Sequence, residues 1–271
     1  MMAILDMIRS LKIRSLSYRY LDIVEKLVNY FTKYALIFAF STSLFAAKEV
    51  QVGAYQFPPF YISKNGKKSG LVYEVIKELN KVQSEYRFKI VETSARRRYR
   101  DFTTKRFDLI LFESPKWGWE ERGIKYDMTP SFLKGGEKFI AKKDKNRTHA
   151  YLRDLKKKSI LLYDGYHYGF LDFDIDQKYD AKLIYTNSHE GNILSVLKGR
   201  GDIAVVTESY LTQFLEDNKN LKDKLIISTH YDQEYSHRAL VTQDSIITSE
   251  KFYHFLKLIK DRPCCRQFSN L

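Results

Sequence analysis

The chain has 271 residues, 44% hydrophobic and 29% charged, and a formal net charge of +13. This size suits one large or two modest globular domains with a real core. The charge alone would suggest nucleic acid or a membrane surface, but Lys and Arg are scattered among nearly as many Asp and Glu, which argues against a nucleic-acid partner. The densest basic runs, Arg96–Arg98 and Lys156–Lys158, are interpreted as solvated surface, or as a segment that faces a ligand or partner.

Residues 1–47 predict an export signal rather than a folded domain. Lys26 and Lys33 precede an apolar run over residues 34–45, and the small pair Ala46-Ala47 follows it. These are the parts of a secretory signal that is cleaved near Ala46 or Ala47. A membrane anchor is the alternative, but the run is shorter than the roughly 20 residues that span a bilayer.

The cysteine content agrees with export to the bacterial periplasm. Cys264 and Cys265 are the only cysteines, and they are adjacent. Neighbouring cysteines bridge only through a strained ring, so we expect neither a structural disulfide nor a metal site. A start codon chosen too far upstream would explain why residues 1–25 are long for a signal.

The first half of the mature chain predicts an α/β unit. Five elements are expected in the order strand, helix, strand, helix, strand: residues 49–55, 69–82, 86–93, about 94–104 and 107–112. Ser69 is the candidate N-cap of the first helix. The order favours a parallel sheet with right-handed crossovers, whose ligands collect at the carboxyl ends of the strands. Residues 55–60, and those just after 112, should therefore lie beside a site.

The pattern then restarts as a second α/β unit. Its elements are expected as strands at 158–165, 181–186 and 201–209, and helices at 190–198 and 209–218. A later strand, 237–241, and helix, 249–260, have no place there and could return to complete the first unit. The sequence thus predicts two lobes with a cleft between them: 48–141 with 232–271, and 142–231, joined by the charged residues 142–147.

Catalytic signatures are missing from this sequence. It contains no GxSxG, Walker loop, HExxH or GxGxxG, and its histidines do not pair at metal-ligand spacing, so we expect no catalysis, metal or cofactor. Polar and aromatic residues gather instead at strand ends: Phe57, Phe60, Ser114, Trp117, Trp119, Arg122, Tyr166, His167, Tyr168 and Glu208. An Arg for a carboxylate, a carboxylate for an ammonium and aromatic faces for the remainder fit a zwitterionic small molecule.

Four motifs, in order along the mature chain, carry a resemblance: "VGAYQFPPF", "KRFDLILF", "ERGIKYDMTPSF" and "GRGDIAVVTES". With them the chain resembles the periplasmic solute-binding proteins of polar amino acid ABC transporters. The resemblance implies a type II periplasmic binding fold, with two lobes of mixed, mostly parallel sheets flanked by helices.

The resemblance also implies residue roles. Arg122 would grip the ligand α-carboxylate, Glu208 the α-ammonium, and Phe57 would lie over the ligand side chain. The family's small hydroxyl residues would correspond to Ser114, and the start of its second lobe to Tyr166 and His167.

Other interpretations of these residues stay open. Arg122 could form a surface ion pair, Glu208 could be a solvated helix start, and Trp117 and Trp119 could belong to the core or touch ligand. The sequence also departs from the family: "ESPKWGW" lengthens one loop, Glu208 replaces an Asp, and "DGYHYGF" brings aromatics to the second lobe. The ligand of such a divergent member could differ from an ordinary amino acid.

The favoured function is an exported, monomeric binding protein that closes around its ligand by hinge motion and delivers it to an ABC transporter permease. Two alternatives remain. One is a dehydratase on the same fold, in which Glu113 or His167 would serve as acid or base. The other is a sensing module that reports ligand state to a membrane partner.

Overall fold

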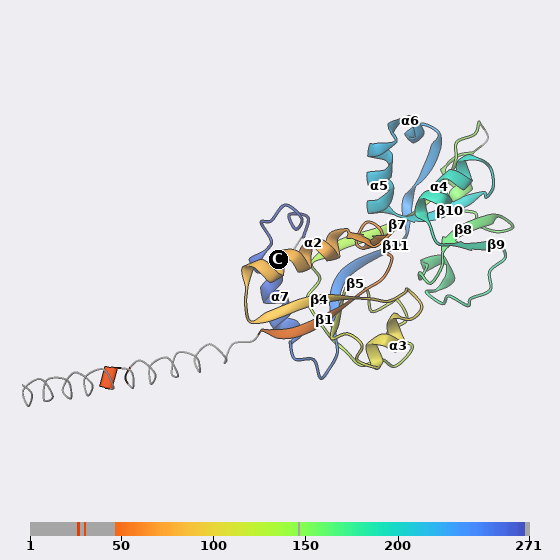
Figure 1. Ribbon diagram of the computed structural model, residues 1–271. Helices are drawn as coiled ribbons and strands as arrows, with labels where there is room; N and C mark the ends of the chain where they lie inside the picture. Colours follow the sequence, from red (N-terminus) through yellow and green to blue (C-terminus); the bar gives the residue numbers. More distant parts are fainter. Residues whose placement is uncertain (1–25, 28–29, 31–46, 146, 269–271) are drawn as a thin grey trace, which may run out of the picture. The chain divides into compact units, whose positions relative to one another are not determined.

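The computed structural model describes residues 26–27, 30, 47–145 and 147–268 (Figure 1). The chain forms two units, Met1–Ala47 and Lys48–Leu271. The second unit holds the fold described below, and nearly all of the predicted export signal lies outside the described residues. No helix in those described ranges combines the length and apolar character that crossing a membrane requires.

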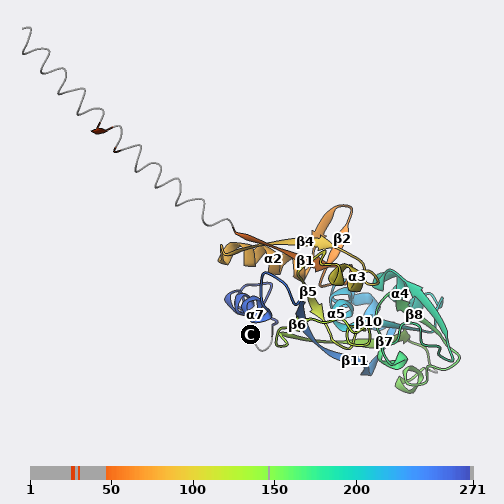
Figure 2. The same cartoon turned by 90° about the horizontal axis from the view of Figure 1, so that it is seen from below.

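Lobe one is built on three parallel strands. Its strands and helices are β1 (Lys48–Ala54), α2 (Leu71–Val82), β4 (Tyr86–Glu92), α3 (Arg98–Thr103), β5 (Leu109–Glu113) and α7 (Ser249–Leu258). β1 lies between β4 and β5. Helix α2 covers this sheet because its buried residues Val72, Val75, Ile76 and Leu79 follow the i, i+3, i+4, i+7 spacing of one helical face (Figures 1 and 2).

The N-cap expected for α2 is wrong. Gly70, not Ser69, occupies the cap, and no side-chain hydrogen bond closes it. Gly70 has φ 97°, and a Cβ there would lie 2.7 Å from the carbonyl oxygens of Pro59 and Phe60. Only glycine accommodates both that backbone conformation and this close approach of the loop after β1.

Lobe two is also built on parallel strands with helices between them. Its strands and helices are β8 (Ser159–Tyr163), β9 (Lys182–Thr186), α4 (His189–Leu197), β10 (Ile203–Thr207), α5 (Glu208–Asp217) and α6 (Lys219–Lys222), with short 3-10 turns at His149–Leu152 and Gly169–Leu171. β8 pairs in parallel with both β9 and β10. Ser188 caps α4 by accepting a hydrogen bond from the backbone N–H of Gly191.

Two long antiparallel strands connect the lobes, β7 (Leu133–Lys142) and β11 (Leu225–Val241), and we call them the crossing strands. The strand order is β4-β1-β5-β11-β7-β10-β8-β9. A two-residue strand, β6 (Asp127–Met128), adds to β11, and β2 (Ile62–Lys64) with β3 (Lys67–Ser69) forms a separate hairpin. Glu137 of β7 is in register with Thr207 of lobe two and with Gln233 of β11. The passage between lobes therefore lies inside β7, earlier than residues 142–147.

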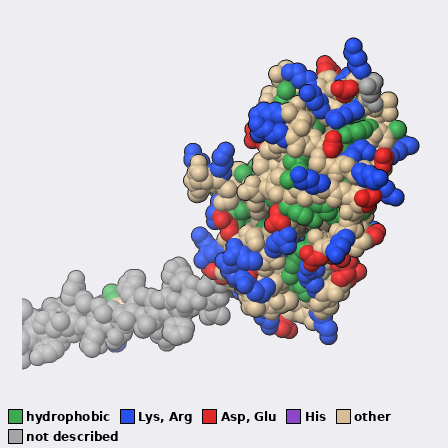
Figure 3. All heavy atoms as spheres, turned by 90° about the vertical axis from the view of Figure 1, so that its right-hand side faces the viewer, with side chains coloured by type: hydrophobic (Ala, Val, Ile, Leu, Met, Phe, Trp, Pro, Cys, Tyr) green, Lys and Arg blue, Asp and Glu red, His purple; other side chains and the backbone are tan. Residues whose placement is uncertain are grey.

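The mixed α/β, two-lobed fold class is confirmed, with three differences in detail. Strand β11 extends far beyond the predicted 237–241, α3 is shorter than predicted, and β7 and the β2–β3 hairpin were not predicted. Late in the chain, β11 pairs antiparallel with β5 of lobe one. On the face drawn in Figure 3, Lys and Arg alternate with Asp and Glu rather than forming one basic patch.

Candidate functional site

A small cavity lies where the carboxyl ends of the strands of both lobes meet. We call it the interlobe cavity; it has a volume of about 10 Å³ and is lined by Tyr55, Phe57, Arg98, Trp117, Glu137, Gly165, Tyr166 and His167. The first four belong to lobe one, Glu137 to the crossing strand β7, and the last three to the loop after β8. Ligands of open α/β sheets bind in this position.

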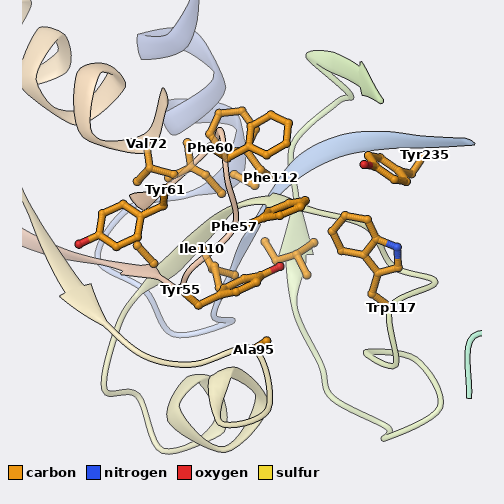
Figure 4. Close-up of a cluster of buried hydrophobic side chains, with 14 of the residues drawn as sticks. Tyr55, Phe57, Phe60, Tyr61, Val72, Ala95, Ile110, Phe112, Trp117 and Tyr235 are labelled. Atoms are coloured by element: carbon orange, nitrogen blue, oxygen red, sulfur yellow. The ribbon is translucent and has the colours of Figure 1, made fainter. Parts of the chain in front are cut away.

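Aromatic rings form most of the wall. The Phe57 ring meets Tyr166 of the opposite lobe edge-on, with centroids 5.3 Å apart, and Trp117 at 5.8 Å. Figure 4 shows Phe57, Trp117 and Tyr235 close together, with Tyr55 below them. The indole N–H of Trp117 donates to Oε1 of Gln233 over 2.9 Å, which fixes the ring. These rings offer apolar and π surface to a ligand body.

A buried ion pair lies behind the rings. Arg98 is 1% exposed and Glu113 is 0% exposed, and Nε of Arg98 lies 3.4 Å from Oε1 of Glu113. The guanidinium also lies over the Tyr99 ring, 4.3 Å from its centroid, and donates to the carbonyls of Ala95 and Gly165. Burial raises the pKa of Glu113, while Arg98 and the indole N–H of Trp119 act in the opposite direction.

A second buried carboxylate, Glu137, has no such cation. It is 2% exposed, and its Oε2 accepts a hydrogen bond from Nε2 of Gln233 at 3.3 Å. Among the described residues no Lys, Arg or His forms an ion pair with it. Loss of solvation, followed by the negative charge of Asp232, raises its pKa well above the usual range.

His167 is held as a neutral side chain. Its Nδ1 donates to the carbonyl of Phe173 over 2.5 Å, and its Nε2 lies 2.6 Å from the Tyr99 hydroxyl. Burial, and then the charge of Arg98, lower its pKa to about 4. Both ring nitrogens thus have partners, and Glu113 forms an ion pair with Arg98 while its Oε2 accepts a hydrogen bond from Trp119.

Acid should destabilise the protein through its buried histidines. Burial lowers the pKa of His167 to about 4 and of His189 and His237 to about 3. Their stabilising contribution is complete above the unfolded pKa of 6.5 and is lost as the pH falls toward these values, at up to about 1.4 kcal/mol per pH unit for each. Urea titrations at pH 7 and pH 5 should show this loss, and His167→Gln should reduce it by about one histidine's share. An equal loss of stability between pH 7 and pH 5 in His167→Gln and in the unaltered protein would contradict this prediction.

The structure brings together four of the seven residues predicted for the site: Phe57, Trp117, Tyr166 and His167. Arg122 is not among the lining residues; it is exposed, with its guanidinium 4.4 Å from the Tyr99 ring centroid and Nη1 donating to the Gly118 carbonyl. Ser114 lines a separate groove beside Lys116.

Glu208 also lies outside the cavity. It begins α5, accepts a hydrogen bond from the Tyr231 hydroxyl at 2.8 Å and has Lys138 at 3.9 Å. Trp119, which the sequence left open between core and ligand, is buried in the main apolar core, and so are Phe60 and Tyr168. Asp202 is structural, as its carboxylate accepts from the backbone and hydroxyl of Ser159.

Sequence reasoning placed Tyr55 beside the site but missed Arg98, Glu137 and Gly165. Arg98 belongs to the basic run for which a ligand-facing role was kept open, but nothing distinguished it from Arg96 and Arg97. Glu137 could only have been found by recognising β7, whose start at Leu133–Gly136 contains two glycines. The rule that strand ends face the site did find the aromatic residues.

Direct contacts hold the two lobes together around the cavity. Arg96 of lobe one forms a bidentate ion pair with Asp164 of lobe two, with Nη2 to Oδ1 at 2.6 Å. The Tyr166 hydroxyl donates to the Gln56 carbonyl at 3.1 Å. These contacts would all be lost if the lobes separated.

Two α/β lobes on crossing strands, with a small cavity between them, define the class of two-lobed solute-binding proteins. The family model for bacterial extracellular solute-binding proteins, family 3, matches residues 50–247, and the chain belongs to this family. The resemblance drawn from the four motifs is thus confirmed. No curated protein matches the chain.

Solved structures with the same fold include transport proteins and a sensor. Holo ArgBP from T. maritima has 20% identity and a TM-score of 0.56, covering 79% of this chain and 92% of its own. AbpA from Streptococcus pneumoniae, an amino acid ABC transporter substrate-binding protein bound to L-arginine, has 18% identity and a TM-score of 0.59, covering 78% and 89%. A histidine kinase sensor domain with similarity to periplasmic binding proteins has 20% identity and a TM-score of 0.61, covering 79% of this chain and 91% of its own. At these identities the likeness concerns the fold alone.

No group of three or more His, Cys, Asp or Glu that could hold a metal ion occurs in the described part of the chain. Cys264 and Cys265 are both free thiols.

Proposed function

We propose that this protein captures a small polar ligand, an amino acid or a related zwitterion, in the interlobe cavity outside the inner membrane and delivers it to an ABC transporter permease. The observation that carries the proposal is the cavity itself, in which a guanidinium (Arg98), a carboxylate (Glu137) and aromatic rings converge from both lobes. Such a set of a few polar groups in an aromatic pocket is typical of small-molecule sites. The amino acid ligand of AbpA, a protein of similar fold, also supports it.

Capture requires the lobes to open. The interlobe cavity has a volume of about 10 Å³, far below the 300–1,000 Å³ that ligand pockets usually have, and both lobes form its walls. The ion pair of Arg96 with Asp164 and the hydrogen bond from Tyr166 to Gln56 would form on closure. Hinge closure on the crossing strands would then bury the ligand and present a closed form to the permease.

A binding screen tests this function. The full chain is purified and its melting temperature is measured with single amino acids, amines and small carboxylates. At a ligand concentration 100 times Kd, binding should stabilise the fold by about 2.7 kcal/mol, because the ligand binds only the folded state. If no compound in the panel raises the melting temperature or gives a calorimetric signal, the proposal fails.

Substitutions at and near the interlobe cavity then test where the best ligand binds. Tyr166→Ala should weaken binding more than 10-fold, since its ring forms part of the wall. Arg122→Ala should weaken it less than 3-fold, because Arg122 is exposed and stacked on Tyr99. A loss of more than 10-fold for Arg122→Ala alone would instead support the role that the family resemblance implies for it.

A sensing role is the second candidate, favoured by the similarity in fold to a histidine kinase sensor domain. The two roles differ in what the cell loses. Deleting the gene should abolish uptake of the radiolabelled ligand if the protein serves transport. Intact uptake together with a lost transcriptional response would support sensing.

A further inference from the structure

One buried carboxyl group at the interlobe cavity, that of Glu137, has no cationic partner among the described residues. Arg98 is cancelled by its ion pair with Glu113, and His167 is neutral. Glu137 remains, and the other lining side chains carry no charge at neutral pH. We infer that the ligand carries a net positive charge and that its cationic group lies against the carboxylate of Glu137. This inference rests on the proposed function and narrows its ligand class to organic cations, either amines or cationic amino acids.

Among the described residues, no neighbouring cationic side chain pairs with Glu137. Its neighbour Lys138 extends away from the cavity, with Nζ 3.2 Å from the Tyr231 ring centroid and 3.9 Å from Glu208. Asp232, the nearest acid that acts on Glu137, is itself satisfied by the backbone N–H groups of Gly169 and Phe170. Burying a carboxylate without a counter-charge is unfavourable, so an incoming cation would relieve a cost that the empty protein bears.

The aromatic walls suit the same ligand. The rings of Phe57, Trp117 and Tyr166 line the cavity beside Glu137. An ammonium or guanidinium is attracted to the faces of such rings, and the attraction grows when water is excluded. Among the side chains that line the cavity, a net anion would meet Glu137 without a free cation, because the guanidinium of Arg98 is already paired.

Ligand binding should also be coupled to the release of protons. Charged and titratable groups that act on Glu137, or are acted on by it, are Asp232 and Tyr235 of β11 and Tyr166 and Tyr168 of the loop after β8. Burial raises the pKa of Glu137 and so favours its protonated form, whereas a bound cation favours the ionised form. Cation binding should therefore release protons and strengthen as the pH rises.

The test compares ligands that share a skeleton but differ in charge. Tyramine, L-tyrosine and 4-hydroxyphenylacetate form one series, and L-arginine and L-citrulline form the other. Isothermal titration calorimetry on the full chain should give at least 10-fold tighter binding for the cation of at least one series than for its neutral or anionic partners. Repeating the titration in buffers of different ionisation enthalpy should reveal the released protons.

Glu137→Gln is the decisive variant, and Glu234→Gln is its matched control. Glu234 is an exposed glutamate on the same crossing strand as Gln233, outside the cavity lining. Glu137→Gln should weaken binding of the cation at least 10-fold and change the affinity for the neutral ligand by less than about 3-fold. The ligand-free variant should be at least as stable as the unaltered protein. Glu234→Gln should change none of these.

The outcomes separate the inference from the proposed function. Saturable binding that ignores ligand charge, or cation binding unchanged by Glu137→Gln, would overturn the inference and leave the binding function in place. Failure of every compound in both series and in the wider panel to bind would overturn both.

Discussion

Arg98→Met is expected to lower the free energy of unfolding by about 3–5 kcal/mol, because it leaves the carboxylate of Glu113 buried without its cation. Both side chains are almost completely excluded from solvent, with Nε and Oε1 3.4 Å apart. The guanidinium also packs over Tyr99 and 5.0 Å from the Tyr55 ring centroid, so those contacts are lost as well. Urea denaturation at pH 7 followed by fluorescence measures the change.

Two further variants distinguish lost charge pairing from lost packing. Arg98→Met combined with Glu113→Gln should recover most of the stability, because no unpaired charge is then buried. Arg122→Met removes a guanidinium that also lies over Tyr99 but is exposed, and it should cost less than about 1 kcal/mol. Equal losses of unfolding free energy for Arg98→Met and Arg122→Met would show that burial does not increase the contribution of Arg98 to stability.

Most of the fold could be predicted because each lobe repeats local patterns. The buried strands β5 and β10 are continuous apolar runs, and α2 shows a clear helical face. Strand β7 could not be predicted, since Gly135 and Gly136 are poor strand formers and are held in place by pairing with β11. The length of β11 has the same origin, because it pairs with β5 in one lobe and with β7 in the passage to the other.

The residues of the site also differ in whether the sequence alone predicts them. Its aromatic residues follow strand ends, so position in the chain alone placed Phe57, Trp117 and Tyr166. Its charged residues depend on partners distant in sequence: Arg98 is buried because Glu113 lies on β5, and Glu137 is buried because β10 and the crossing strand β11 flank it. A sequence pattern records neither partner, and the family motif directed attention to Arg122 instead.

Gly165→Ala is expected to weaken ligand binding 10-fold or more by obstructing closure. Gly165 lies in the loop after β8 with φ +78°, and an added Cβ would lie 2.9 Å from Cβ of Ala95 and 3.1 Å from Cγ of Arg96, both in the opposite lobe. Relief of these contacts requires the lobes to separate where Arg96 binds Asp164. A loss of about 1.4 kcal/mol in closure energy already corresponds to a tenfold change in affinity. Calorimetry measures the affinity, and small-angle scattering with saturating ligand measures closure.

Backbone strain needs its own control, because alanine at positive φ costs about 1–2 kcal/mol wherever it occurs. Gly199→Ala provides it: Gly199 has φ +69°, and nothing lies within 4 Å of the position of its added Cβ. Both variants should lose similar stability when the ligand is absent, whereas only Gly165→Ala should lose affinity and remain more open with ligand. Equal affinity in the two variants would mean that the contact between Gly165 and Ala95 does not control closure, and that the ligand is held without the lobes meeting at this point.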